Sequence, residues 1–250
     1  MTIQQIDLNE EKKFLNDTAN TYTVDNSSQT RVIRELVVRT FSPYLRRGIG
    51  LELGCSDGYM TKMLASNLEH LDVVDGSTKF LNEAKKRNLT NVEYHFSLFE
   101  EYTSTKKYDY VFASYIMEHV LEPSLVLKMV KQVLKPDGFL FMVVPNARAL
   151  SRQLAMHMGL ISDLKALTEN DLANGHRRVY DRVYFNREIE QAGFESISEG
   201  GLMLKILADF QLDKLIDDGL LQQIQIDGLY KLGNEYPDLC GSLYSICRPK

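Results

Sequence analysis

Apolar residues recur along this chain with two spacings. Over residues 29–46 they stand three or four positions apart, which predicts an amphipathic helix. Beyond it, short apolar runs alternate with stretches of helical spacing. Strands are predicted at residues 50–53, 71–74, 92–96, 110–114 and 139–144, with helices between them at residues 59–68, 78–87 and 123–134. This alternation is typical of a doubly wound parallel α/β sheet, which binds ligands at the carboxyl ends of its strands.

The pattern is less regular outside this core. The first 28 residues are polar and are expected to form a short helix and loop that packs late or covers a site. A turn at residues 135–138 is predicted to stop the preceding helix. Residues 146–184 interrupt the alternation and are expected to be helical and loop-like. Beyond them the pattern predicts a helix at residues 187–192, one or two amphipathic helices at 203–232 and a last strand at 243–247.

Composition is that of an ordinary globular protein, since 44% of the 250 residues are apolar and 25% are charged. The longest apolar run, residues 139–144, is too short to cross a bilayer, and the amino terminus lacks a secretory pattern. Three cysteines at unrelated spacings predict neither a disulfide framework nor a zinc site. We therefore expect a cytoplasmic protein without a membrane partner. A net charge of −5 disfavours a nucleic-acid partner.

The densest candidate chemistry follows the first two predicted strands. Gly54 and Gly58 bracket a turn after the first strand, and Asp75 ends the second. Glycines let a backbone approach a ligand, and a carboxylate at the second strand tip can accept both hydroxyls of a ribose, although a helix cap is the alternative for Asp75. Glu52 and Asp57 put negative charge where a dinucleotide needs its pyrophosphate. The charges therefore favour S-adenosylmethionine over NAD.

Several separated segments resemble the class I S-adenosylmethionine-dependent methyltransferases, over roughly residues 30–200. These segments are residues 52–58, 75–77, 97–99, 108–120 and 134–140. Two positions depart from the family pattern: Ser56 replaces the central glycine of the first motif, and Ser97 stands where an aspartate is frequent. The order and spacing of the segments together carry the resemblance.

The resemblance implies a Rossmann-like, seven-stranded, mostly parallel sheet with helices on both faces and a helical insertion or cap. It also implies a single domain over residues 1–250. The expected parts are an N-terminal helical segment (1–46), a cofactor-binding core (47–145), helical insertions or a cap (146–185 and 203–235), and segments that complete the sheet (186–202 and 236–250).

S-adenosylmethionine is the implied cofactor, and S-adenosylhomocysteine its product. Glu52 and Asp75 are expected to hold the amino-acid and ribose parts, and residues 97–99 to flank the adenine. The complete expected set comprises Glu52, Gly54, Cys55, Gly58, Asp75, Gly76, Ser77, Ser97, Leu98, Phe99, Ser114 and Tyr115.

Residues beyond the fourth and fifth strands are the candidates for the methyl acceptor. His176 is a candidate general base, with His119 the next, although Glu118 and His119 also fit a packing role. Arg177 and Arg178 are candidate clamps for an anionic group. Asn146 and Arg148 complete the predicted acceptor set; the alternative for the arginines is a solvated loop. No Asp, Asn or His set has metal-ligand spacing, so no metal is expected.

The segment from residue 145 to residue 194 also resembles a bacterial subgroup associated with surface-polysaccharide and nucleotide-sugar methylation. That implies O-methylation of a small polar metabolite, either phosphorylated or linked to a nucleotide sugar. Three alternatives stay open: N-methylation of another metabolite, a catalytically silent cofactor-binding or assembly protein, and a dehydrogenase. The apolar spacing over residues 203–232 further suggests a homodimer formed through C-terminal helices.

Overall fold

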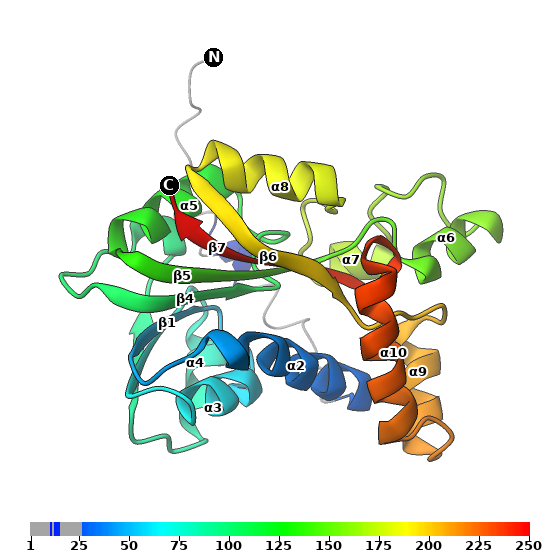
Figure 1. The fold of residues 1–250 in the computed structure, drawn as a ribbon, viewed down its shortest axis with the longest axis horizontal. Coiled ribbons are helices and arrows are strands. Elements are labelled where there is room, and N and C mark those ends of the chain that lie inside the picture. Colours follow the sequence, from blue (N-terminus) through cyan, green and yellow to red (C-terminus); the bar gives the residue numbers. More distant parts are fainter. Residues whose placement is uncertain (1–10, 12, 16–26) are drawn as a thin grey trace.

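The computed structural model describes Glu11, residues 13–15 and residues 27–250. These residues form a seven-stranded sheet in the order β3-β2-β1-β4-β5-β7-β6 (Figure 1). Its first five strands run parallel, and β7 runs antiparallel between β5 and β6. The predicted Rossmann-like, mostly parallel sheet is confirmed. The strands are β1 (Ile49–Leu53), β2 (His70–Asp75), β3 (Val92–Phe96), β4 (Tyr108–Ser114), β5 (Leu134–Pro145), β6 (Phe194–Leu202) and β7 (Ser242–Pro249).

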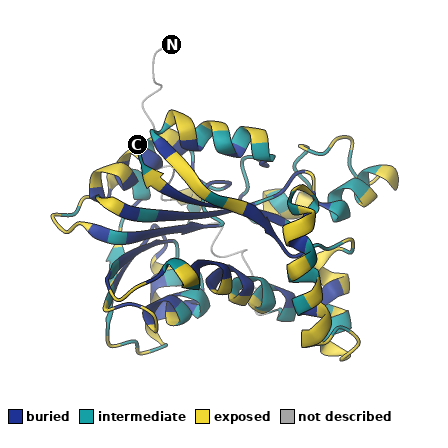
Figure 2. Cartoon of the chain, viewed as in Figure 1, coloured by how far each residue is buried: buried dark blue, intermediate teal, exposed yellow. Residues whose placement is uncertain are grey.

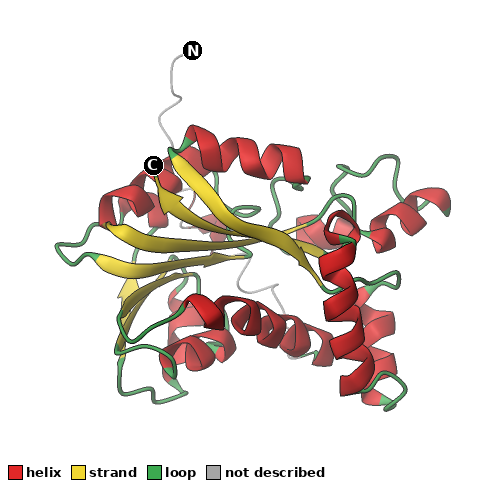
Figure 3. Cartoon of the chain, viewed as in Figure 1, coloured by secondary structure: helices red, strands yellow, loops and turns green. Residues whose placement is uncertain are grey.

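Helices cover both faces of the sheet, because the central strands are apolar on both sides (Figure 3). On β4, for example, Val111 belongs to the apolar core of one face and Phe112 to that of the other. The first face packs against α5 (Pro123–Val133) and α8 (Arg182–Gln191), and the second against α2 (Ser28–Phe41), α3 (Tyr59–Ala65) and α4 (Thr78–Lys85). Figure 2 shows the central strands buried between these two layers, whereas part of the edge strand β6 is exposed.

The predicted turn at residues 135–138 is wrong. The chain passes from α5 directly into β5, which already pairs with β4 at Leu134. The pairing of Tyr108 with Leu134 and of Tyr110 with Phe139 leaves the intervening residues of β5 in a bulge. A bulge absorbs extra residues without ending a strand, and its Pro and Gly produce the same sequence signal as a turn.

The helices outside the core lie in the segments where the sequence shows no regular alternation of strands and helices. The insertion after β5 contains α6 (Leu150–His157) and α7 (Glu169–Ala173), and the segment before β7 contains α9 (Asp209–Asp217) and α10 (Gln223–Glu235). Leu212 and Ile226 of the last two helices pack against Leu36 of α2 in a small third core. The helix predicted at residues 187–192 begins earlier, at Arg182. Among the described residues no helix has the length and apolarity that a bilayer crossing needs.

Only part of the predicted N-terminal helical segment lies within the described residues. Glu11 and residues 13–15 are helical, and α2 ends in a short 3-10 turn, Ser42–Tyr44. The prediction for residues 1–10, 12 and 16–26 falls outside the described part of the chain.

Candidate functional site

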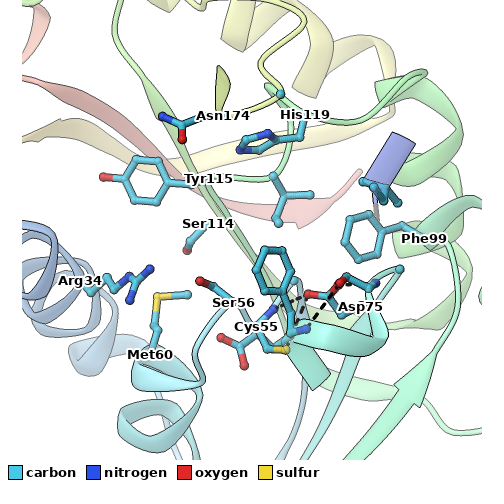
Figure 4. A pocket seen from close by; sticks show the side chains of 18 of the residues that line it. Arg34, Cys55, Ser56, Met60, Asp75, Phe99, Ser114, Tyr115, His119 and Asn174 are labelled. Carbon is cyan, nitrogen blue, oxygen red and sulfur yellow. Dashed lines mark hydrogen bonds between the residues drawn. The ribbon is translucent and has the colours of Figure 1, made fainter. Parts of the chain in front are cut away.

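A pocket opens at the carboxyl ends of β1, β2 and β4, as expected for a parallel sheet of this topology (Figure 4). Residues from the strand ends, from α2, from residues 14–15 and from the insertion line it together. The lining comprises Phe14, Leu15, Arg34, Glu52, Gly54, Cys55, Ser56, Met60, Asp75, Gly76, Ser77, Phe80, Phe99, Ser114, Tyr115, Ile116, His119, Asn174 and Gly175.

The turn after β1 brings its backbone to the pocket at Gly54. Its φ of +74° favours glycine, and a Cβ there would lie 2.3 Å from Cδ1 of Ile116. Gly58 has a different role from the one predicted. It caps α3 with φ +73° and is not among the lining residues, and a Cβ there would lie 2.9 Å from Ala84 of α4. Gly58 therefore permits close helix packing rather than cofactor contact.

Asp75 ties two loops together at the pocket wall. Its carboxylate accepts hydrogen bonds from the backbone N–H of Ser77 (2.8 Å) and of Cys55 (3.0 Å). Burial raises the pKa of this carboxyl group, and the two amide donors oppose that shift. The ligand role and the loop-capping role considered for Asp75 are thus compatible, because a carboxylate accepts several hydrogen bonds.

Glu52 is the most unusual carboxyl group of the pocket. It is fully buried, and its two oxygens have no hydrogen-bond partner among the described residues. Burial raises its pKa to about 8, opposed by neighbouring Thr61 and by the charge of Arg34. The buried hydroxyl of Ser114 also lacks a partner within this described set. Buried polar groups are normally satisfied, so a ligand that donates hydrogen bonds or carries positive charge fits here.

The charge predicted at Asp57 does not face the pocket. Asp57 is buried and forms ion pairs with Arg34 (2.9 Å) and Arg87 (2.8 Å), so it cannot repel a diphosphate as the sequence suggested. Arg34 itself lines the pocket from α2. Sequence reasoning missed it, since an arginine on an amphipathic helix carries no local signal of a site.

Apolar side chains form the side of the pocket beyond Asp75. Phe99 lines it as predicted, but Ser97 and Leu98 do not: the Ser97 hydroxyl donates to the Leu98 carbonyl (2.8 Å), and Leu98 is buried. Sequence reasoning missed five other apolar side chains of the lining. Two belong to the amino-terminal segment, and three lie within a few residues of a predicted cofactor residue. They are Phe14, Leu15, Met60, Phe80 and Ile116.

The loop after β4 contributes Tyr115 and His119. Tyr115 adopts φ +58°, and its hydroxyl bonds the Ser242 hydroxyl at 2.8 Å. Burial, with His176 nearby, lowers the pKa of His119 to about 3 and keeps its ring neutral. A backbone hydrogen bond links the ring to Gly175.

His176 lies behind His119 rather than in the pocket lining. The two rings meet edge to face, with centroids 4.7 Å apart, and Nδ1 of His176 lies 3.2 Å from the Asp171 carboxylate. Burial raises the pKa of the adjacent Glu118 to about 7, and its oxygens have no hydrogen-bond partner in the described part of the chain. Ligand atoms of Glu118, His119 and His176 lie within 4.8 Å of one another, a metal-compatible grouping that spacing along the sequence did not predict.

Three of the four remaining predicted acceptor residues form side-chain hydrogen bonds within the protein instead. Arg177 donates to the His119 carbonyl (2.7 Å) and pairs with Glu11 (2.8 Å), while Arg178 donates to backbone carbonyls of residues 117, 120 and 121. Asn146 is buried and donates to two carbonyls near η3 (Pro237–Leu239). Arg148 is exposed and does not line the pocket. The guanidinium groups of Arg177 and Arg178 thus bind within the protein, and their role as an anion clamp stays a prediction.

Comparison with known proteins places this geometry in a family. The family described as methyltransferase domain matches residues 26–199. A ubiquinone biosynthesis O-methyltransferase of Actinobacillus pleuropneumoniae is 27% identical over 126 residues, covering 47% of this chain and 53% of the relative. A relative of the same name from Acinetobacter baylyi is 26% identical over 171 residues, covering 66% of this chain and 67% of that protein. The chain thus spans about half the length of the first curated relatives it matches.

Solved structures share the fold at low sequence identity. The N-methyltransferase NodS of Bradyrhizobium japonicum, in complex with S-adenosylhomocysteine, superposes with a TM-score of 0.61 at 11% identity, covering 96% of this chain and 97% of that one. The PH0226 protein of Pyrococcus horikoshii gives 0.62 at 20% identity, covering 92% and 95%. With the family match over most of the chain, these findings establish that the chain belongs to the class I S-adenosylmethionine-dependent methyltransferases.

Proposed function

We propose that this protein transfers a methyl group from S-adenosylmethionine to a hydroxyl oxygen of a small molecule bound beside His119. The observation that carries the proposal is that the pocket has two sides lined by different residues. Cys55, Ser56 and Asp75 lie on one side of it, whereas Tyr115, His119 and Asn174 lie on the other (Figure 4). One side thus suits the cofactor and the other an acceptor.

The residues present fit S-adenosylmethionine. The unpartnered Glu52 carboxyl group suits a cationic amino-acid group, which would favour its charged form. Asp75 can accept ribose hydroxyls, and the apolar wall of Phe99 and Ile116 suits an adenine face. When bound, the cofactor supplies an electrophilic methyl group on a positively charged sulfur.

His119 is the group best placed to take the hydroxyl proton. Its ring lines the pocket and is neutral, so the nitrogen that does not bond Gly175 can accept a proton from the acceptor oxygen. Glu118 and His176 lie directly behind it, and the Glu118 carboxylate can stabilise the positive charge that the ring acquires. His176 is then a positioning residue, since it does not line the pocket.

The acceptor that fits best has a largely apolar body and one hydroxyl group, as a phenol has. Phe14 lines the pocket and stacks on Arg177, which also contacts the His119 carbonyl, so it provides apolar surface near His119. The curated relatives are named for O-methylation. The narrower prediction of a phosphorylated or nucleotide-linked sugar in polysaccharide biosynthesis stays a prediction. It is disfavoured by the contacts of Arg177 and Arg178, because their guanidinium groups bind Glu11 and backbone carbonyls rather than facing an anionic acceptor.

The decisive experiment measures S-adenosylhomocysteine release from purified protein with three acceptor panels: phenols and catechols, nucleotide sugars and sugar phosphates, and small amines. Turnover confined to the first panel is expected. Turnover confined to the second would restore the sugar acceptor, and turnover confined to the third would replace O-methylation by N-methylation. Tight cofactor binding without turnover on any panel would instead favour the silent assembly protein.

Asp75→Asn should weaken S-adenosylhomocysteine binding by about 1–3 kcal/mol, because a charged acceptor of hydrogen bonds is lost. Isothermal titration calorimetry measures the change. Asp137→Asn, at an exposed position of β5, provides the matched control and should bind like the wild type. An unchanged affinity in the Asp75 variant would remove this residue from the site.

His119→Gln should lower kcat by about 100-fold or more and leave S-adenosylhomocysteine affinity within twofold, because a positioned base acts only on the chemical step. His176→Gln should lower kcat less, by about tenfold, since it acts through His119. His157→Gln, on the exposed side of α6, should retain wild-type kcat. If His176→Gln were the more severe variant, the base assignment would pass to His176.

A further inference from the structure

Two histidines and two carboxylates meet on one face of the sheet, away from the pocket. His70 and Asp72 alternate along β2, and Glu93 and His95 alternate along β3. Asp72 pairs directly with Glu93 across the two strands, so all four side chains project from the same face. This is the face that also carries Val74, opposite to that of Val73.

Ligand atoms of His70, Asp72 and Glu93 lie within 4.8 Å of one another, and His95 bonds the same carboxylate. Nε2 of His70 lies 3.0 Å and Nε2 of His95 lies 3.1 Å from the same oxygen of Asp72. Oxygens of Glu93 lie 3.9 Å from His70 and 4.0 Å from His95. Ligand atoms around a tetrahedral zinc ion, about 2.0–2.2 Å from the metal, stand about 3.4 Å apart. The observed spacings to Asp72 and Glu93 bracket that value.

The anchor of the cluster is built into the fold. Asp72 has no solvent exposure, and the Tyr108 hydroxyl donates to its second oxygen at 2.6 Å. Lys106 also donates to this carboxylate, and the rings of His70 and His95 both hydrogen-bond to its other oxygen. A ligating carboxylate held by an outer hydrogen bond is the usual arrangement of a metal centre.

A cation already occupies this point. Nζ of Lys106 lies 3.0 Å from Asp72 and 3.1 Å from Glu93. One ammonium balances only one of the two carboxylate charges, whereas a divalent ion balances both. The Lys106 side chain comes from the loop before β4 and is 43% exposed, so it can turn into solvent when a stronger cation arrives.

The geometry points to a transition-metal site that takes Zn²⁺ through His70, Asp72, Glu93 and His95, with the Lys106 ammonium holding the place of the metal in its absence. Two imidazoles with two carboxylates form a donor set that zinc accepts, and that magnesium and calcium, which prefer oxygen ligands, do not match. The bound ion would fasten edge strand β3 to β2. This inference is independent of the proposed methyl transfer.

The test is calorimetric titration of the metal-free protein with ZnCl₂ near neutral pH, together with a thermal melt. Wild-type protein should bind zinc at this site, and its Tm should rise by about 5 °C at zinc concentrations about 100-fold above Kd. The double variant His70→Gln/His95→Gln should lose one zinc equivalent and the Tm shift. Lys106→Met should bind zinc several-fold more tightly, because a competing charge is removed.

Two controls separate this cluster from other histidines. His157→Gln should behave like the wild type, since its side chain is exposed on α6. His176→Gln, in the cluster with Glu118 and His119, should keep the equivalent assigned to the β2–β3 site. The inference is overturned if the His70/His95 double variant binds as much zinc as the wild type, or if the lost equivalent belongs to His176→Gln. Should the double variant fail to fold, unchanged affinity in Lys106→Met overturns it alone.

Discussion

Three carboxyl groups near the ends of β1 and β2 have different roles because their hydrogen-bond and ion-pair partners differ. Asp57 is neutralised by two arginines, and Asp75 accepts hydrogen bonds from two backbone amides. Glu52 is buried without a hydrogen-bond partner among the described residues, and its pKa rises to about 8. Of the three, Glu52 and Asp75 are therefore available to bind a ligand, because Arg34 and Arg87 neutralise the charge of Asp57.

Glu52 makes the stability of the ligand-free protein depend on pH. The raised pKa means that the unfolded chain loses this proton at lower pH than the folded chain does. The contribution of protonated Glu52 to the unfolding free energy is complete below the ordinary pKa of glutamate. It is lost as the pH rises toward the folded-state pKa of about 8. Relative to Glu52→Gln, the wild type should thus lose up to about 1.4 kcal/mol of unfolding free energy per pH unit in this window.

Urea titrations at about pH 5, 6.5 and 8 measure this difference. Glu235→Gln, at an exposed position of α10, is the control and should follow the wild type at every pH. Parallel stability curves for Glu52→Gln and the wild type would show that the Glu52 carboxyl group titrates normally.

At the scale of elements, the position of the turn after β1 depends on how closely α3 approaches α4. Gly58 begins α3 in a left-handed conformation, against the backbone of Ala84 in α4. A glycine at this position of a motif looks, in sequence, like one that contacts a ligand. The distance to Ala84 shows that it serves packing, which in turn sets the position of the turn at Gly54 and Ser56.

Gly58→Ala should destabilise the protein by about 2–4 kcal/mol, since it adds a steric clash to the strain of a positive φ. Gly219→Ala provides a matched control: its φ is +69°, close to +73° at Gly58, but nothing lies within 4 Å of its added Cβ. That variant should lose only about 1–2 kcal/mol. Chemical denaturation measures both, and equal losses would exclude a packing role for Gly58.

At the scale of the whole molecule, the pocket is closed by segments far apart in sequence. Phe14 and Leu15 line it from the amino-terminal segment, and Asn174 and Gly175 line it from the insertion. Arg177 joins the two, because it pairs with Glu11 at 2.8 Å and its guanidinium lies 4.4 Å from the centroid of the Phe14 ring. The expectation that the amino-terminal segment covers a site agrees with these contacts of its described residues.

The pair Glu11 and Arg177 should therefore couple to ligand affinity. Glu11→Gln and Arg177→Met should each weaken S-adenosylhomocysteine binding, and the double variant should be no weaker than the poorer single one. The coupling is expected at about 1 kcal/mol for a pair this buried. Disrupting the exposed pair of Lys214 in α9 and Asp218 at its C-cap is the control and should leave the affinity unchanged. Additive losses would show that the two residues act separately.

The homodimer prediction also belongs to this scale. Phe210 of α9 and Ile224 of α10 are exposed, which is compatible with a surface formed by the C-terminal helices. It stays a prediction that sedimentation of the purified chain can test.

The sequence by itself determined the alternation of strands and helices through the parallel core, and the residues at the ends of β1 and β2 that line the pocket. Those features rest on local signals: the period of apolar residues in β1 to β5, the glycine at 54 and the carboxylates at 52 and 75. These features can be predicted from the sequence because the helix and strand periods depend on backbone geometry within a few residues.

Only the tertiary structure decided which charged groups are available. Arg34 lines the pocket from a helix that precedes the motif, Asp57 faces two arginines, and Arg177 and Arg178 bind carbonyls and Glu11 instead of an acceptor. The clustering of His119 with His176, and of His70 with His95 around Asp72, likewise depends on which strands and loops become neighbours. The partners of a charged side chain come from distant parts of the chain, and therefore its pKa and its role are properties of the folded molecule.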